Sequence, residues 1–397
     1  MNSKLLGSIL LIVGTSIGAG ILGLPIAAAQ LGFIGSIILL FVCWFIMTSG
    51  ALLILEVNMW LPPNNNLISM AKATIGPVGQ VIAWLTYLLL LYSLLCAYIA
   101  GGSDLFRSLL MAGGIHVTAW LSAVIFTVLF GAIVYFGIRS VDRVNRVLMS
   151  VKFGAFFTLT FLLMFFISSK KLATGNLHYL TSISAITVTA CSFGWATLIP
   201  SLRVYFNDDI KKLKTAIFIG SIIPLVCYII WDAVIMGIIP LNGDNSLVSI
   251  VNSAHSTSDL VNILSSSVGK GSITFIVKLF TSICVLTSFL GVALCLTDFF
   301  ADGFQLEKKG LGKMIIHAIT FIPALVVAIL IPNAFIKALS YAGIYCIILL
   351  ILLPAWMAWR GRYHRQLTSA FTVRGGKIFL SFLMMLSFGL IVRSFVS

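Results

Sequence analysis

Apolar runs of about 20 residues recur from one end of this sequence to the other, and they leave few folds open. That length matches the ~30 Å of hydrocarbon that a helix must cross in a bilayer. Inside lipid, backbone N–H and C=O groups must be paired within a helix or a closed barrel. Strands of such a barrel alternate between lipid-facing and lumen-facing residues, and these runs do not alternate. The sequence therefore predicts an all-α integral membrane protein.

The charge content favours the same class. Charged residues make up 9% of the chain and the mean hydropathy is +1.12, whereas soluble domains carry about 25% charged residues. The net charge of +14 is spread over short loops, so a nucleic-acid partner is not expected. All seven cysteines lie in apolar runs without a C-x-x-C pair, which is typical of buried thiols. No phosphate-binding G-x-x-x-x-G-K motif occurs, so the chain encodes no ATP motor.

We predict eleven spans in one transmembrane domain that covers residues 1–397. The predicted spans cover approximately residues 6–29, 34–57, 79–102, 119–138, 147–168, 183–202, 215–239, 273–300, 314–331, 335–356 and 376–396. Cytoplasmic loops of membrane proteins are enriched in Lys and Arg. With a cytoplasmic N-terminus, 18 of the 25 Lys and Arg lie in cytoplasmic loops, six lie outside and Lys278 lies within a span. This asymmetry predicts a cytoplasmic N-terminus and, after eleven spans, a C-terminus on the outer side.

Two of the predicted spans contain residues that interrupt a helix. The first holds four glycines and a proline between Gly14 and Pro25, and the sixth holds Gly194 followed six residues later by Pro200. Glycine lowers the cost of unwinding, and proline removes a backbone donor. We therefore expect both spans to be broken helices.

Paired breaks of this kind indicate a binding site near the membrane midplane of a secondary transporter. Unpaired N–H groups at the start of a half-helix bind a carboxylate, and unpaired carbonyls accept from an ammonium group. A small zwitterion is therefore the expected substrate. The alternative is that the glycines only allow close helix packing. The breaks match in position if two repeats span about residues 1–170 and 180–358, with 376–396 as an extra helix.

Around these breaks the sequence resembles the hydroxy/aromatic amino acid permease family, and most of all its tyrosine-specific members. The likeness runs along the whole chain and is carried by Gly14–Gly20 with Pro25–Ala29, Leu53–Val57, Ala97–Gly101, Phe193–Gly194 with Ile199–Leu202, Gly220–Leu225 with Tyr228 and Trp231, and Thr287–Leu294 with Asp298, Ala301 and Asp302. The resemblance implies eleven helices with a LeuT-type 5+5 inverted repeat in a bacterial inner membrane. It also implies import of aromatic amino acids, tyrosine first, by proton symport with alternating access.

The substrate site is expected at the two broken helices. In the first, the candidates are Gly14, Thr15, Ser16, Gly18, Ala19 and Gly20. In the sixth they are Phe193, Gly194 and Trp195, and the resemblance adds Tyr92 and Tyr98 of the third span. For Trp195 and the two tyrosines, the alternative is packing against other helices or lipid. Relatives place an aromatic–His–Gly sequence after the helix-6 Phe-Gly, whereas Trp195-Ala196-Thr197 stands here, so a proton role for that histidine does not carry over.

Four residues are candidates for ion or proton coupling. Thr287 and Ser288 either hold an ion, as paired hydroxyls do in sodium-coupled relatives of the fold, or bond back to their own helix. Lys152 matches a lysine whose amine occupies the sodium position in proton-coupled relatives, or it is one more cytoplasmic-side charge. Glu56 either takes part in coupling or reaches the membrane interface. Asp232 is a further intramembrane charge whose partner the sequence does not identify.

Lys4 and Asp302 form a predicted inner gate. Asp302 lies fourteen residues beyond Ser288, about 21 Å along a helix, so both charges reach the cytoplasmic surface if Ser288 is near the midplane. The resemblance supports this pair, because LeuT-type transporters close the inside with a basic residue before helix 1 and an acidic residue ending helix 8. Asp298 is the rival partner, and two unrelated interfacial charges are the alternative.

Other functions are alternatives to this one. The same fold would also suit tryptophan, serine or another small amino acid, with sodium as the coupling ion. A channel needs pore-lining polar residues or filter loops, and a membrane enzyme needs a catalytic or metal-binding cluster at membrane depth. The sequence contains neither pattern. The expected partners are therefore an aromatic amino acid, a proton and the lipid bilayer, without a cofactor.

Overall fold

The computed structural model describes residues 3–63, 65–269, 271–305 and 309–396, and within them the chain forms helices and turns without a β-strand. Nine of the described helices are long and apolar enough to cross a membrane, and a tenth span results when the bent pair at the N-terminus counts as one. The all-α integral membrane class is thereby confirmed. The fourth expected span is an apolar helix of 17 residues, so the count of eleven spans stays a prediction.

The helices follow the predicted spans closely. The first half of the chain contains α1 (Ser3–Ser16), α2 (Gly20–Ala27), α3 (Gly32–Met59), α4 (Leu67–Thr74), α5 (Pro77–Ala112), α6 (Ala119–Tyr135) and α7 (Ile138–Leu163). The second half contains α8 (Ser169–Leu172), α9 (Ile183–Ser192), α10 (Ile199–Tyr205), α11 (Ile210–Ile238), α12 (Leu247–Asn252), α13 (Ser256–Val268), α14 (Gly271–Gly303), α15 (Gly310–Leu330), α16 (Ala334–Ile347), α17 (Leu353–Tyr363) and α18 (Gly376–Val396).

Local sequence explains where several helices begin. The side chain of Asn66 accepts the N–H of Ser69 at 2.9 Å and caps α4. Asp209 caps α11 in the same way through the N–H of Lys212, at 3.1 Å. Gly76 has a φ of +106°, a conformation that glycine adopts without strain, and it turns the chain into α5.

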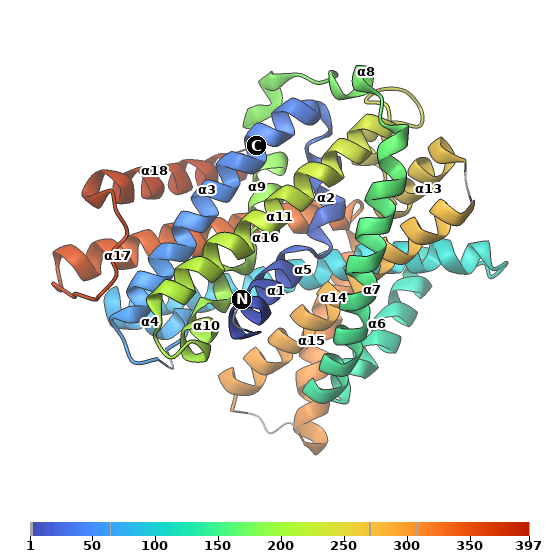
Figure 1. Ribbon diagram of the computed structural model, residues 1–397. Coiled ribbons are helices and arrows are strands. Elements are labelled where there is room, and N and C mark those ends of the chain that lie inside the picture. Colours follow the sequence, from blue (N-terminus) through green and yellow to red (C-terminus); the bar gives the residue numbers. More distant parts are fainter. Residues whose placement is uncertain (1–2, 64, 270, 306–308, 397) are drawn as a thin grey trace.

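The helices run between two faces of the molecule (Figure 1). Helices α4 and α10 lie at the face where the chain begins, and α8 and α13 lie at the other. Lys4 Nζ of α1 lies 5.5 Å above the ring of Tyr205 in α10. At the other end, the N–H of Asn176 after α8 donates to the carbonyl of Gln30 after α2, at 3.0 Å. We call these the N-terminal face and the opposite face.

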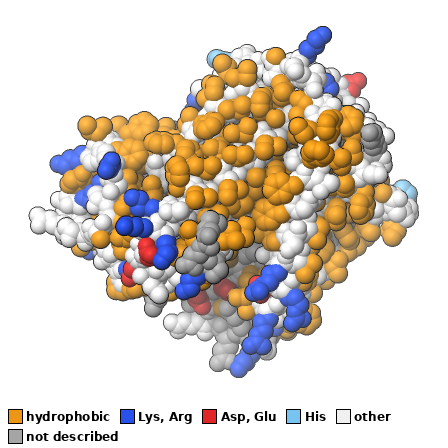
Figure 2. Space-filling view, viewed as in Figure 1, with side chains coloured by type: hydrophobic (Ala, Val, Ile, Leu, Met, Phe, Trp, Pro, Cys, Tyr) orange, Lys and Arg blue, Asp and Glu red, His pale blue; other side chains and the backbone are white. Residues whose placement is uncertain are grey.

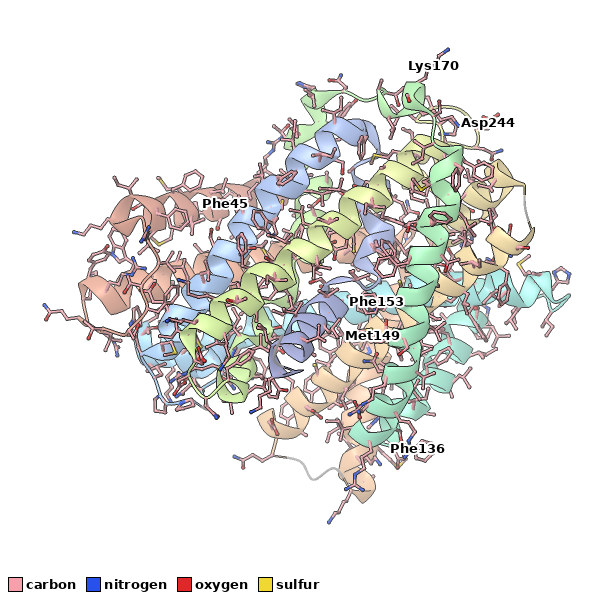
Figure 3. The ribbon with its side chains drawn as sticks, viewed as in Figure 1. Phe45, Phe136, Met149, Phe153, Lys170 and Asp244 are labelled. Atoms are coloured by element: carbon pink, nitrogen blue, oxygen red, sulfur yellow. The ribbon has the colours of Figure 1, made fainter. Side chains whose placement is uncertain are left out.

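An apolar surface faces outwards between the two faces. Figure 2 shows it over α3, α11 and α7, with Lys and Arg gathered towards the left and the bottom of the view. Phe45 projects outwards from α3 (Figure 3) and is 55% exposed, and Phe157 of α7 is 63% exposed. Such a surface is stable in contact with lipid, whereas in water an apolar patch of this kind would promote association or aggregation. The orientation stays a prediction, and two of its charges, Lys270 and Lys308, lie outside the described residues.

The first predicted break is a bend between two helices, whereas the sixth span crosses as one segment whose α-helical geometry is interrupted; we call this interruption the second break. In the first span, α1 ends at Ser16 and α2 begins at Gly20, and the two axes differ by 50°. In the sixth, α9 ends at Ser192 and a 3₁₀ turn over Gly194–Leu198 leads into α10. Pro200 lies in the first turn of α10, where its missing N–H is not needed. The glycine and proline positions therefore locate both breaks correctly.

Buried charges join helices near the N-terminal face. Glu56 of α3 accepts from Arg362 of α17 at 2.7 and 2.5 Å, and it also accepts the N–H of Val373 at 2.7 Å. The Glu56 side chain is fully buried, so it does not reach the membrane interface as a free charge. Arg203 of α10 donates to the main-chain carbonyl of Asn58 in α3. Removing one partner of such a pair would leave a buried, uncompensated charge.

Candidate functional site

The break in the first helix reroutes two main-chain hydrogen bonds. The N–H of Gly18 turns back to the carbonyl of Ser16, at 2.9 Å. The N–H of Ala19 leaves its own helix and donates to Ser288 Oγ of α14, at 3.0 Å. The turn between α1 and α2 is therefore held partly by a side chain 269 residues further along the chain.

This rerouting releases two carbonyls from the helix. In an unbroken helix each N–H bonds to the carbonyl four residues earlier, so Gly18 and Ala19 would occupy the carbonyls of Gly14 and Thr15. Both of these residues line a cavity. Two carbonyl oxygens beside a cavity form a cradle for a group that donates several hydrogen bonds, such as an ammonium group.

Two further helices hold the break from other sides. Lys152 of α7 is fully buried, and its Nζ donates to the carbonyl of Ile17 at 2.6 Å. The hydroxyl of Tyr228 in α11 lies 2.6 Å from the carbonyl of Ser16 and 2.9 Å from that of Ser192. Together with the serine of α14, these side chains supply partners that the interrupted helices lack.

Close approach requires glycine at position 18, whereas the atom nearest Gly14 is the flexible end of a methionine side chain. A Cβ on Gly18 would lie 2.2 Å from Ser288 Oγ, and one on Gly14 would lie 2.0 Å from Cε of Met149. Figure 3 shows Met149 on the side of α7 that faces α1. Any side chain at Gly18 would displace the hydroxyl that accepts the Ala19 N–H.

A cavity of about 300 Å³ lies beside the two breaks. Helices α1, α5, α7, α9, α14 and α16 form its walls together with the 3₁₀ turn of the second break. The predicted residues that line it are Gly14, Thr15, Tyr98, Gly194, Thr287 and Ser288. Leucines of α1 and α5 make much of the remaining wall apolar. The cavity lies at the lower end of the usual size range for small-ligand sites.

The four hydroxyl groups expected at this site bond first to their own helices. Thr15, Ser16, Thr287 and Ser288 each donate to a main-chain carbonyl three or four residues earlier, at 2.8 to 3.1 Å. Ser288 Oγ in addition accepts the N–H of Ala19. Ser16, Gly18, Ala19 and Gly20 form the turn itself, and Thr15 faces the cavity.

Tyr92 lies outside the cavity, against the expectation for its helix. Its hydroxyl donates to the carbonyl of Ile319 in α15, at 2.7 Å. Pro323 stands four residues after Ile319 and has no N–H to donate to that carbonyl. Tyr92 therefore completes the hydrogen bonding of a proline-interrupted helix.

Phe193 and Trp195 lie behind the second break. Both are 1% exposed, and neither is among the residues that line the cavity. The ring of Phe193 packs edge-on against that of Tyr228, with centroids 5.3 Å apart. On the cavity side, the second break presents Gly194 and Thr197 instead.

Sequence reasoning missed several residues of the site. Tyr87 of α5 and Asn145 of α7 line the cavity. Asn145 precedes Lys152 by seven residues, or two helical turns, so the two lie on one face of α7. That spacing could have identified Asn145. Tyr228 carried part of the family resemblance but was not assigned a role.

A second hollow of about 450 Å³ continues from the cavity to the N-terminal face. The two share Tyr87, Thr197 and Cys295 in their linings. Asp298 and Asp302 line the outer part of this hollow. Within the described residues Lys4 and Asp302 form no ion pair, and Lys4 instead lies above the ring of Tyr205.

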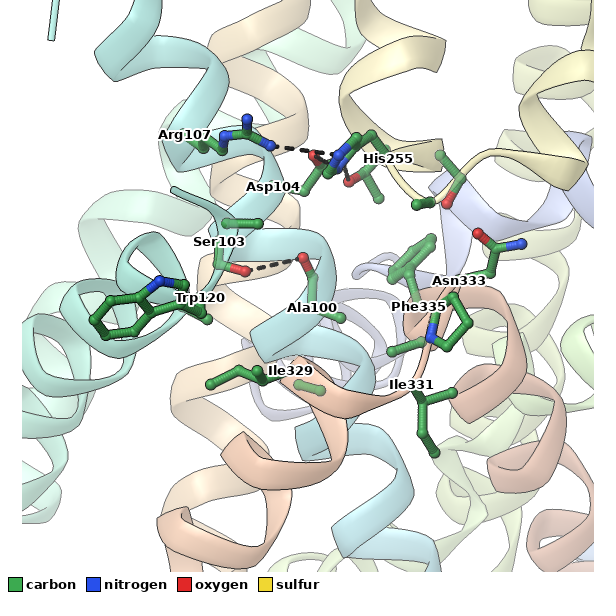
Figure 4. A pocket seen from close by; sticks show the side chains of 18 residues that line it. Ala100, Ser103, Asp104, Arg107, Trp120, His255, Ile329, Ile331, Asn333 and Phe335 are labelled. Atoms are coloured by element: carbon green, nitrogen blue, oxygen red, sulfur yellow. Dashed lines mark hydrogen bonds and ion pairs between the residues drawn. The ribbon is translucent and has the colours of Figure 1, made fainter. Parts of the chain in front are cut away.

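A third hollow, of about 340 Å³, lies at the opposite face (Figure 4). The carboxylate of Asp104, near the end of α5, accepts from Thr257 Oγ1 at 2.6 Å, from the N–H of Ser258 at 2.8 Å and from His255 Nδ1 at 3.0 Å. Arg107 Nη1 lies 3.3 Å from His255 Nε2. A carboxylate at the start of α13 is stabilised by the positive end of that helix. This cluster fastens α5 to α13.

These features define a multi-pass membrane protein with a small-molecule cavity at a break in its first helix. The model of the tryptophan/tyrosine permease family matches residues 1–394. The chain belongs to this family of permeases, which are transporters and not enzymes.

Relatives with different substrates in their names resemble the chain almost equally. It is 33% identical over 398 residues to tyrosine-specific transport system 1 of Haemophilus influenzae, which covers 99% of this chain and 96% of the relative. It is 30% identical to the tryptophan-specific transport protein of the same organism, over 97% and 94% of the two chains. Glutamine transporter 2 of Aliivibrio fischeri is 31% identical over 99% of each.

The first prediction concerns Gly18. We expect Gly18→Leu to abolish amino-acid uptake while the protein stays in the membrane, because the new side chain displaces Ser288 and distorts the break. Gly7→Leu is the matched control in the same helix, since a Cβ on Gly7 meets nothing within 4 Å. If Gly18→Leu shows normal uptake at equal amounts of protein in the membrane, the helix break is not part of the substrate site.

The second prediction concerns His255. The hydrogen bond with Asp104 raises the pKa of His255 above its ordinary value, and Asp259 adds to this effect, while burial and Arg107 oppose it. Because the folded state holds this proton more tightly, His255 stabilises the fold fully below about pH 6.5 and loses that contribution as pH rises through the raised pKa. The Tm difference between wild type and His255→Ala should therefore be largest near pH ~5.5 and shrink towards pH ~8.5.

The control for this measurement is His116→Ala, because His116 is exposed in the loop after α5. The Tm difference between wild type and His116→Ala should not shrink as the pH rises, as that of His255→Ala does. A His255→Ala difference that is constant, or that grows as the pH rises, would contradict the proposed hydrogen bond.

Proposed function

We propose that this permease imports an aromatic amino acid, tyrosine first, by proton symport with alternating access in the inner membrane of a bacterium. The proposal includes eleven spans with a LeuT-type inverted repeat and a cytoplasmic N-terminal face. One observation carries it. Gly14 and Thr15, whose carbonyls lose their helical partners at the break, line the same cavity as Tyr87 and Tyr98, and the buried Lys152 holds that break. The names of the tyrosine and tryptophan relatives support the substrate class.

The two ends of the substrate have different partners in this proposal. The ammonium group donates to the carbonyls of Gly14 and Thr15, which the break releases. The carboxylate is attracted towards the start of α2, where the helix carries partial positive charge. The aromatic ring lies against Tyr87, Tyr98 and the leucines of α5. Burying about 150–250 Å² of ring at about 25 cal/mol/Å² contributes roughly 4–6 kcal/mol before costs.

Lys152 is the proposed proton carrier. Its protonated amine donates to the carbonyl of Ile17 at 2.6 Å, within the turn that Ser288 also holds. Loss of the proton weakens this bond, since hydrogen bonds from charged donors are stronger than neutral ones. Protonation of Lys152 is in this way linked to the shape of the substrate site. Sodium held by Thr287 and Ser288 is the alternative.

Lys4 and Asp302 remain the proposed inner gate. The hollow at the N-terminal face joins the cavity, and Asp302 lines it. Lys4 and Asp302 are not paired while the hollow at the N-terminal face is open, which is the arrangement expected of an inward-facing state. An exposed pair contributes only about 0–1 kcal/mol, so it would change the balance between conformations more than the folding.

The function is tested by uptake into membrane vesicles. Labelled tyrosine, phenylalanine and tryptophan are each measured with and without an inwardly directed pH gradient. We expect accumulation of aromatic amino acids that the gradient increases, and competition by aromatic amino acids well above that by alanine or glutamine. Equal competition by alanine would exclude the aromatic assignment, and preferential competition by glutamine would favour the alternative that the glutamine relative suggests.

Coupling is tested with Lys152→Ala. This variant should lose accumulation driven by the pH gradient but retain exchange of internal for external substrate, because Ser288 and Tyr228 still hold the break and Lys152 does not itself line the cavity. Lys171→Ala at the opposite face is the control for loss of a lysine. Gradient-driven accumulation by Lys152→Ala, or sodium-dependent uptake by the wild type, would contradict the assignment of Lys152 as the proton carrier.

A further inference from the structure

The two helix breaks meet at a single hydroxyl group. Tyr228 of α11 is fully buried, and its OH lies 2.6 Å from the carbonyl of Ser16 and 2.9 Å from that of Ser192. Ser16 is the last residue of α1, and Ser192 is the last residue of α9. The C-terminal ends of both half-helices thus converge on one side chain, although 176 residues separate them.

This convergence has an electrostatic reason. The C-terminal end of a helix carries partial negative charge on its unpaired carbonyls. Two such ends that face each other without a donor between them would repel. A hydroxyl has one proton and here faces two acceptors, so it is shared between the carbonyls of Ser16 and Ser192. The shared proton holds the two ends at one spacing.

Packing around Tyr228 fixes the position of its hydroxyl group. The Tyr228 ring packs edge-on against Phe193, which directly follows the second half-helix end. Helix α11 is itself bonded to α3 at two levels. Asp232 accepts from Ser36 one turn beyond Tyr228, and Trp44 Nε1 donates to Ser221 at 3.1 Å on the other side. The tyrosine therefore has little freedom to leave its two acceptors.

We propose that Tyr228 is a positioning residue that couples the two helix breaks. It fixes the distance between the substrate-facing groups of the first break, at Gly14 and Thr15, and those of the second, at Gly194. Lys152 and Ser288 act differently, because their bonds reach only the first break. The inference deepens the function proposed above and rests on it, since it concerns the same cavity.

The test compares Tyr228→Phe with Tyr92→Phe. Each substitution removes one hydroxyl that donates to a main-chain carbonyl inside the helix bundle, and Tyr92 serves the unrelated proline interruption of α15. We expect Tyr228→Phe to raise the KM for tyrosine uptake about tenfold or more, with similar amounts of protein in the membrane. The KM of Tyr92→Phe should stay within about twofold of wild type.

Two further measurements separate positioning from mere stability. One fixed concentration of tyrosine, well above the wild-type KM, should raise the Tm of wild type and Tyr92→Phe alike, and that of Tyr228→Phe by less. Replacing Tyr228 by p-aminophenylalanine, whose amine can donate to both carbonyls, should restore the KM to within about threefold of wild type. A wild-type KM and ligand shift in Tyr228→Phe, or failure of the amine to restore function, would overturn the proposal. The amine variant decides the matter even if Tyr228→Phe does not fold.

Failure of the proposed function would look different. The wild type would then neither accumulate an aromatic amino acid nor gain Tm from one. The positioning role of Tyr228 can still be tested in that case. The measurement is the rate at which a small thiol reagent labels Cys191 in a chain that lacks the other cysteines. Release of the neighbouring Ser192 carbonyl should make this rate several-fold faster in Tyr228→Phe than in Tyr92→Phe, and equal rates would overturn the role of Tyr228.

Discussion

The break in the first helix can exist only because side chains replace the hydrogen bonds that the backbone gives up. Main-chain groups in a membrane cannot turn to bulk water, so an unpaired group there costs several kcal/mol. Ser288 accepts the N–H of Ala19, Lys152 donates to Ile17 and Tyr228 donates to Ser16. Gly14 and Thr15, whose carbonyls lose their helical partners at the break, line a cavity of about 300 Å³.

The rest of the fold places those three side chains. They come from α7, α14 and α11, and each of these helices must approach α1 closely. Glycine makes the approach of α14 possible, since a Cβ on Gly18 would lie only 2.2 Å from Ser288 Oγ, and Gly220 of α11 packs closely against Ile12 of α1 in the same way. The same region therefore needs glycine for two reasons, to unwind and to pack.

Much of this arrangement could be predicted from the sequence, because its determinants are local. Glycine and proline spacing located both breaks, and apolar runs located the helices. Side-chain partners far apart in the sequence could not be predicted in the same way. Glu56 accepts hydrogen bonds from Arg362, which lies 306 positions further along the chain. The hydroxyl of Tyr92 donates to a carbonyl that Pro323 cannot pair with. Nothing in the sequence around Tyr228 identifies its two acceptors, because both lie on other helices.

The central claim is that the substrate lies at the break in the first helix, and protection of Cys191 tests it most directly. Cys191 lines the cavity beside the second break, whereas Cys227 of α11 does not. In chains that retain one of these cysteines each, a small thiol reagent is applied with and without saturating tyrosine. The account predicts that tyrosine, but not alanine, slows labelling of Cys191 and leaves that of Cys227 unchanged. Labelling of Cys191 at the same rate with and without bound tyrosine would contradict it.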